Sequence, residues 1–417
     1  MAEQTAKPRP GVPQVGDPFL FGVNYWPRRK AMYWWKDFDA AEVREEFALI
    51  RDVGIGYVRF FMLWEDFQPT PETVSPEALK NLHTVADIAA EFGLKLEPTL
   101  FTGHMSGPNW APTWLMSDKP AVPGWRPVIS GGAVDPRQIY NVYVTPWVVE
   151  AEERMVRAIV SELKGHPAVW AYSLGNEPDL FCHPPTHEDG KAWVKRIVDV
   201  IQDVEPDRPV TIGLHTASIE GEVGLRVNDL AEVTDFSVMH GYSIYAPWAK
   251  TPLDTDVVPF ANALTAALAG RPCLFEEYGL CTAWPGQPSH YEEYPRIGQM
   301  TKQYFPSEEA GAEYYYHVMR KLHKTGALGA FGWCFADYVE SLWDKPPCNE
   351  FIHERFFGLV RPDGSLKEIA KVIREFAATK PVIQPQSHKL DLGVTPEGYY
   401  ADPGGNLRRL YKGFSVE

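Results

Sequence analysis

The chain has 417 residues and a formal net charge of −15, which argues against nucleic acid or an anionic membrane as a partner. Its hydrophobic content of 45% is enough for a large core, and its 14 tryptophans suit both a core and the apolar faces of sugar rings. The five cysteines show no CxxC pair and no metal-ligand spacing with histidine, so we expect free thiols in a cytoplasmic protein without metal or cofactor.

The N-terminal segment, residues 1–18, is polar and proline-rich, and we expect it to be flexible. It lacks the apolar stretch that a signal peptide needs, and no run of the chain approaches membrane-spanning length. The oligomeric state has no signal in the sequence.

From residue 19 onward, short apolar runs alternate with amphipathic helical stretches. The expected strands are 19–24, 57–62, 94–100, 169–178, 210–214, 236–240, 273–277 and 329–335. Capping signals precede several helices, such as Asp39 before one helix and Ser365 before the last. Strands alternating with helices predict the α/β class and a (β/α)8 TIM barrel over residues 19–379. An open doubly wound sheet is the alternative, but no glycine-rich phosphate loop follows any strand.

Two insertions and the tail depart from this pattern. The loop after the third strand has roughly 40 residues, far more than a usual connection, which indicates a functional role. Its aromatic residues include Trp110, Trp114 and Trp125, and a second insertion spans 281–307. Residues 380–417 lack a helical period, so we expect a C-terminal extension that packs on the barrel as a small β appendage or a strap.

Polar residues gather where the predicted strands end, which is where the active site of such a barrel lies. Glu177 ends the fourth strand and Glu277 ends the seventh. The other candidates at these ends are Arg59, His104, Asn176, His240, Tyr242 and Trp333. Two carboxyl groups among hydrogen-bond donors and an aromatic platform predict glycoside hydrolysis, and no metal-binding set emerges from these residues.

Glu276 competes with Glu277 for the role of nucleophile. Neighbouring side chains of a strand point to opposite faces, so we expect only one of the two to face the barrel centre. We favour Glu277 because it directly precedes Tyr278 and Gly279. A lone glutamate at a strand end is more often a surface or capping residue, but two of them, each in its own motif, are hard to explain in that way.

These motifs carry a family resemblance. Residues 174–178, LGNEP, resemble the acid/base motif of clan GH-A, the retaining (β/α)8 glycoside hydrolases, and residues 275–279, FEEYG, resemble its nucleophile motif. The eight candidates are similar in kind and order to the site residues of glycoside hydrolase family 5, over about residues 19–376.

The chemistry, supported by this resemblance, implies a role for each residue. We expect Glu277 to attack the anomeric carbon while Arg59 and Tyr242 keep it ionised. We expect Glu177 to act as acid and then base, with a raised pKa. The three further roles, binding the sugar 2-hydroxyl, orienting the acid and forming the floor of the subsite, fall to Asn176, His240 and Trp333.

The predicted function is a retaining β-glycoside hydrolase that cleaves β-mannosidic or β-glucosidic bonds. The resemblance to the β-mannosidase and mannanase branches of family 5 favours mannose. The insertions would wall off one end of a cleft, which favours exo action on short oligosaccharides. The alternatives are an endo-β-mannanase or endoglucanase of the same clan, a transglycosylase with the same residues, and a non-catalytic carbohydrate-binding barrel.

Overall fold

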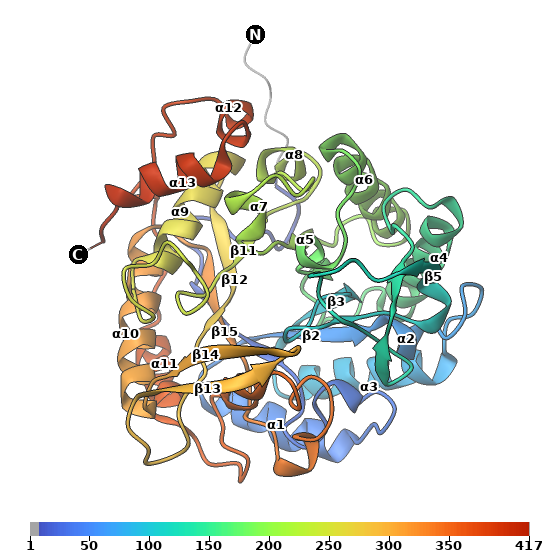
Figure 1. Cartoon of the computed structure of the whole chain (residues 1–417), viewed down its shortest axis with the longest axis horizontal. Helices are drawn as coiled ribbons and strands as arrows, with labels where there is room; N and C mark the ends of the chain where they lie inside the picture. The colour runs from blue at the N-terminus through green and yellow to red at the C-terminus, as the bar shows by residue number, and fades with distance from the viewer. Residues whose placement is uncertain (1–7, 417) are drawn as a thin grey trace.

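Eight parallel strands form one curved sheet surrounded by helices in the computed structural model, which describes residues 8–416 (Figure 1). In chain order the strands are β1 (Leu20–Tyr25), β2 (Tyr57–Leu63), β3 (Lys95–Thr102), β9 (Tyr172–Asn176), β10 (Val210–Gly213), β11 (Ser237–His240), β12 (Cys273–Gly279) and β15 (Gly329–Trp333). Each expected strand overlaps one of these. The predicted (β/α)8 barrel is therefore confirmed.

The barrel closes between the two ends of the sheet. Its strands follow the order β10-β9-β3-β2-β1-β15-β12-β11. Across the remaining gap, the His240 N–H donates to the Leu214 carbonyl at 2.7 Å, and the Thr216 N–H donates to the His240 carbonyl at 3.0 Å. Because all eight strands are parallel, their C-terminal ends meet at one face of the barrel.

Helices cover the outside of the barrel, as the apolar stripes predict. They are α1 (Ala40–Asp52), α3 (Pro76–Glu91), α4 (Pro146–Leu163), α6 (His187–Val204), α8 (Val227–Ala231), α9 (Val257–Ala269), α10 (Glu308–Lys324) and α11 (Glu368–Ala378). Asp39 caps α1, but the predicted cap of α11 is wrong. That helix begins after Lys367, and the Ser365 hydroxyl donates to Asp363 instead. Within residues 8–416, no helix is long and apolar enough to cross a bilayer.

The two insertions form small sheets of their own. The first contains β4 (Asn109–Trp110), β5 (Met116–Pro120), β6 (Val128–Ser130), β7 (Ala133–Asp135) and β8 (Arg137–Ile139). The second is a hairpin of β13 (His290–Arg296) and β14 (Gln299–Phe305), which reaches toward the barrel centre in Figure 1. Both insertions follow C-terminal ends of barrel strands, so they stand on the face where the candidate residues gather.

The described part of the N-terminal segment is held in place. Its first seven residues lie outside the described residues. From there on, Arg9 forms an ion pair with Asp235 at 2.9 Å, and the Trp170 indole N–H donates to the Gly11 carbonyl at 2.8 Å. The expected flexibility therefore does not extend to this part, which packs against residues at the N-terminal ends of the strands.

The C-terminal extension is helical, and the prediction that it lacks helical structure is wrong. It contains α12 (Pro396–Tyr400) and α13 (Pro403–Lys412), beside α7 (Ala217–Glu220) and α9 in Figure 1. The Tyr400 hydroxyl donates to the Ser218 carbonyl at 2.9 Å, and the Tyr411 hydroxyl donates to Asp254 at 2.6 Å. The extension thus braces the loops that follow β10 and β11.

Candidate active site

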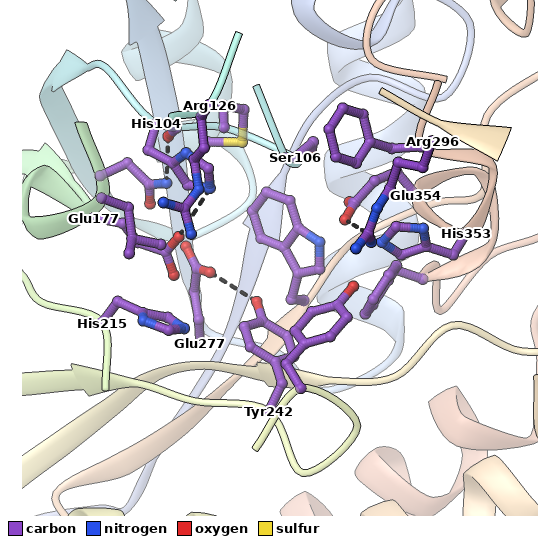
Figure 2. A pocket seen from close by; sticks show the side chains of 18 of the residues that line it. His104, Ser106, Arg126, Glu177, His215, Tyr242, Glu277, Arg296, His353 and Glu354 are labelled. Atoms are coloured by element: carbon purple, nitrogen blue, oxygen red, sulfur yellow. Dashed lines mark hydrogen bonds and ion pairs between the residues drawn. The ribbon is translucent and has the colours of Figure 1, made fainter. Parts of the chain in front are cut away.

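A cavity of about 480 Å³ lies at the C-terminal ends of the strands (Figure 2). This volume suits a small ligand. Six of the eight predicted residues line the cavity: His104, Asn176, Glu177, Tyr242, Glu277 and Trp333. The other two, Arg59 and His240, are fully buried and contact the carboxylates that line it. The structure therefore brings all eight candidates together.

The two candidate catalytic acids face each other across the barrel. One carboxylate oxygen of Glu177 and one of Glu277 lie within 4.8 Å of each other. Glu177 follows β9 in a left-handed backbone conformation, with φ 46° and ψ 53°. Such a conformation costs a non-glycine residue about 1–3 kcal/mol and occurs preferentially at functional sites. The turn that ends β9 is thus shaped to bring this carboxylate into the cavity.

Two donors hold the Glu277 carboxylate. The Arg59 guanidinium donates to Glu277 Oε1 at 2.6 Å, and the Tyr242 hydroxyl donates to Oε2 at 2.8 Å. Each of these hydrogen bonds favours the ionised carboxylate, which is the nucleophilic form. Each oxygen has its own donor, so the carboxylate has a fixed orientation.

Glu276 also points into the barrel, which corrects the expectation from simple strand alternation. The pairing of β12 with β15 changes register between Phe275 and Tyr278, so the alternation breaks at the two glutamates. Glu276 is fully buried, and its Oε2 accepts from His240 Nε2 at 2.8 Å and pairs with Arg59 Nε at 3.1 Å. Of the two, only Glu277 lines the cavity.

His240 hydrogen-bonds two of the buried acids, Glu177 and Glu276. Its Nε2–H donates to Glu276, and its Nδ1–H donates to Glu177 Oε1 at 3.2 Å. Burial alone would lower the pKa of this imidazole, but the charge of Glu277 and the hydrogen bonds to Glu177 and Glu276 raise the pKa to about 9. His240 is therefore a cation at neutral pH and donates from both nitrogens.

His104 is neutral, and its partners fix its tautomer. Asn109, which the sequence did not single out, donates its amide protons to the Phe181 carbonyl at 3.3 Å, which leaves its Oδ1 to accept from His104 Nδ1–H at 2.8 Å. Burial lowers the pKa of His104 to about 4. The free lone pair on Nε2 therefore faces Glu177 Oε2 at 3.7 Å and suits a protonated carboxyl there.

Asn176 and Asn24 orient Arg59. The Arg59 guanidinium donates to Asn176 Oδ1 at 2.9 Å and to Asn24 Oδ1 at 3.0 Å. The Asn176 amide nitrogen donates to the His104 carbonyl at 2.8 Å, with its second proton directed to no described acceptor. Asn24 was missed, although its place as a polar residue near the end of the first apolar strand was a usable signal.

Glu97 is a second residue that sequence reasoning missed. It lies opposite Arg59 in the pairing of β2 with β3 and is fully buried. Burial and the charge of Glu276 raise the pKa of Glu97 well above its ordinary value. This shift favours the neutral acid at Glu97, whereas Arg59 and His240 lower the pKa of Glu276 and favour its anion. A charged residue inside an otherwise apolar strand was the available signal.

The catalytic pair does not have the expected distribution of pKa values in the ligand-free protein. Burial raises the pKa of Glu277, and the charge of Glu177 acts in the same direction. Burial would also raise the pKa of Glu177, but His215 and the protonated His240, which donates to this carboxylate, outweigh the effect of burial and lower the pKa. Two carboxyls this close titrate as a pair, so their pKa values belong to the pair rather than to either residue alone.

The wall of the cavity contains several residues that the sequence did not indicate. Trp333 lies in the cavity as expected, but Trp110, Trp114, Trp125, Trp284 and Trp343 do not line it. Loop residues do so instead: Arg126, His215, Tyr245, Arg296, His353 and Glu354. These residues come from insertions and loops whose paths depend on long-range contacts, so sequence spacing gave no signal.

Among residues 8–416, two groups of side chains have the spacing of metal ligands. Glu177, His240 and Glu277 form one, and His83, Asp87 and His166 form the other on the outside of the barrel. In the first group, the protonated His240 and the Arg59 guanidinium already supply positive charge to the carboxylates. This donor set therefore fits a carboxylate pair that works without a metal.

Comparison with known proteins finds relatives that are named as mannan hydrolases. A Probable mannan endo-1,4-beta-mannosidase F from Aspergillus flavus is 26% identical over 174 residues, which cover 34% of this chain and 35% of that protein. A Probable mannan endo-1,4-beta-mannosidase A from Aspergillus clavatus is 29% identical over 163 residues, covering 36% and 43%. The chain thus spans about a third of the length of the first curated relatives that it matches.

Solved structures share the fold over nearly the whole chain. A GH5_18 protein from Streptomyces cattleya, in complex with Manb1-4GlcNAc, has a TM-score of 0.74 at 20% identity, covering 95% of this chain and 91% of that one. An exo-beta-1,4-mannosidase, Op5Man5 from Opitutaceae bacterium strain TAV5, has a TM-score of 0.69 at 23% identity, covering 87% and 60%. The predicted resemblance to clan GH-A barrels is confirmed. A family model described as "Glycosyl hydrolases family 2, TIM barrel domain" matches residues 134–379, more than half of the chain, and the chain therefore belongs to this family.

Proposed function

We propose that the protein is a retaining β-glycoside hydrolase that removes β-linked mannose from the ends of short oligosaccharides. The observation that carries this proposal is the separation of the two acids, whose nearest carboxylate oxygens lie within 4.8 Å. Retaining enzymes have carboxyl groups about 5–5.5 Å apart, whereas inverting enzymes need about 6.5–9.5 Å to admit a water.

Double displacement assigns a task to each acid. Glu277, held by Arg59 and Tyr242, attacks the anomeric carbon and forms a glycosyl ester. Glu177, in its protonated form, donates its proton to the leaving oxygen and then takes a proton from the incoming water. The hydrogen bonds from Arg59 and Tyr242 favour the anionic form of Glu277. The lone pair on His104 Nε2 lies 3.7 Å from Glu177 Oε2 and suits the protonated form of Glu177.

The wall opposite Glu177 supports exo action. In Figure 2, Arg296, His353 and Glu354 lie across the pocket from Glu177. The hairpin tip is tied to this wall, because the Ile297 N–H donates to Glu350 at 3.0 Å and Tyr294 hydrogen-bonds His353 at 2.6 Å. On this proposal, the wall on the side away from the acid closes the subsite beyond the transferred sugar, so that only a terminal residue is accepted.

The names of the relatives support mannose and also supply the alternative. The curated relatives are named as endo-acting mannan hydrolases, so an endo-β-mannanase of the same clan is the second candidate. A panel of p-nitrophenyl glycosides tests the sugar, and we expect the β-mannoside to be cleaved faster than the β-glucoside. Mannohexaose tests the mode of attack. Mannose alone as the early product supports exo action, whereas a ladder of mid-sized products would rule it out.

A further inference from the structure

Arg126 stands on the wall of the cavity that contains Glu177. The residue belongs to the insertion after β3, and Figure 2 shows it on the same side as His104 and His215, across the pocket from Arg296. On the proposed function, on which this reasoning rests, the acid contacts the leaving oxygen. The wall with Arg126 therefore faces the leaving group rather than the sugar that is transferred.

The Arg126 guanidinium has no fixed partner. It is half-buried, yet it forms no hydrogen bond or ion pair within 4.0 Å among residues 8–416. The acids that attract it are Glu177 and Asp179, and Asp179 already accepts from the Ser218 hydroxyl at 2.8 Å and the His215 N–H at 3.1 Å. A half-buried guanidinium loses hydration without gaining acceptors, unless a ligand supplies them.

His215 supplies a second donor on the same wall. Its Nδ1 accepts from the Ala217 N–H at 3.0 Å, so the ring carries its proton on Nε2. Figure 2 shows this ring directed into the pocket beside Glu177 and Glu277. The neighbouring lining residues, Gly124 and Leu180, offer no side-chain acceptor. Apart from the catalytic acid and the Nε2 lone pair of His104, which faces that acid, this wall therefore presents donors and apolar surface.

The local charge narrows the choice of ligand. Arg296 on the opposite side adds a second positive charge that acts on Arg126, in a chain whose net charge is −15. A neutral hydroxyl would accept a hydrogen bond from Arg126 but would leave its charge uncompensated. An oxyanion matches the guanidinium in charge, and two of its oxygens can accept from the fork of N–H donors. We infer that the substrate's leaving group carries an anionic substituent, a carboxylate, sulfate or phosphate, which Arg126 and His215 bind.

Binding of free sugars tests this inference without turnover. By calorimetry at low salt, we expect the full chain to bind glucuronate about tenfold or more tightly than glucose, because a charge-assisted pair replaces a hydroxyl contact. Arg126→Gln should bring the two affinities within about twofold of each other. The control is Arg137→Gln, at an exposed arginine of the same insertion that pairs with Asp135, and it should keep the preference. Equal affinities in the wild type, or a preference that survives in Arg126→Gln, would overturn the inference.

Turnover separates this inference from the proposed function. β-Mannosyl-1,4-glucuronate and β-mannosyl-1,4-glucose share the leaving oxygen and differ at one carboxylate. We expect kcat/KM to favour the acidic disaccharide about tenfold in the wild type and to lose this preference in Arg126→Gln. A wild type that favours the neutral disaccharide contradicts the inference. If neither disaccharide nor an aryl β-mannoside is cleaved, the proposed mannosidase activity fails, and the glucuronate comparison still decides the inference.

Discussion

Removing the Tyr242 hydroxyl should raise the apparent pKa of the nucleophile. This hydroxyl donates to Glu277 Oε2 at 2.8 Å in a buried setting. Burial and the charge of Glu277 raise the pKa of Tyr242 well above its ordinary value, so the donor keeps its proton through the working range. A hydrogen bond to a charged group contributes about 1.5–3 kcal/mol, and each pKa unit corresponds to about 1.4 kcal/mol. Tyr242→Phe should therefore raise the pKa by about 1–2 units.

The assay is the pH dependence of kcat/KM for an aryl β-mannoside. Because the nucleophile must be ionised, the acidic limb should move to higher pH by about 1–2 units, and kcat/KM at the optimum should fall by about 10- to 100-fold. Tyr245→Phe is the matched control, since Tyr245 lines the same cavity without a hydrogen bond to Glu277 among the described residues. An acidic limb that stays in place in Tyr242→Phe would refute the reasoning.

Four further predictions follow from the same contacts. Glu177→Ala should lose activity mainly on substrates with poor leaving groups, and azide should restore turnover with β-glycosyl azide as the product; a lack of rescue counts against the acid/base role. His240 stabilises the fold below pH 6.5, and this contribution, on the order of 3 kcal/mol, should disappear as pH rises through about 9. Urea unfolding should show this pH dependence in the wild type but not in His240→Gln. The same change of the free energy of unfolding with pH in both proteins would contradict the prediction. Glu97→Gln should keep kcat within about threefold, because burial raises the pKa of this carboxyl and favours its neutral form, whereas Glu276→Gln should lower kcat by more than about 100-fold; similar losses in both variants would argue against the assigned charges. Tyr400→Phe should lower the free energy of unfolding by about 1–2 kcal/mol in chemical denaturation, and an unchanged value would contradict the bracing role of the extension.

The barrel was predictable because its strands are buried on both faces. A run such as Tyr57–Leu63 is buried almost throughout and apolar except for Arg59, and glycines such as Gly54 end the preceding helix. The errors lie where packing decides the structure. α13 has ten residues and two glycines, and it is stabilised by contacts of Leu407 and Tyr411 that no local pattern contains.

The catalytic pair was predictable because each glutamate lies in a local motif, and the barrel rule brings strand ends together. The supporting residues were not. Strand alternation fails at Glu276 because the register shifts there, and that shift depends on the pairing with β15. Arg126 and Arg296 lie in insertions whose positions depend on distant contacts, such as the hydrogen bond from Ile297 to Glu350. Sequence spacing carries no information about such contacts.

The covalent intermediate offers the most direct test of double displacement. A 2-deoxy-2-fluoro-β-mannosyl fluoride should inactivate the enzyme, and fragmentation of the labelled peptide in a mass spectrometer should place the sugar on Glu277, with ¹H NMR showing the β-anomer as the first product of ordinary turnover. A label on Glu276 would contradict the assignment of Glu277 as the nucleophile. The α-anomer as the first product would contradict double displacement itself.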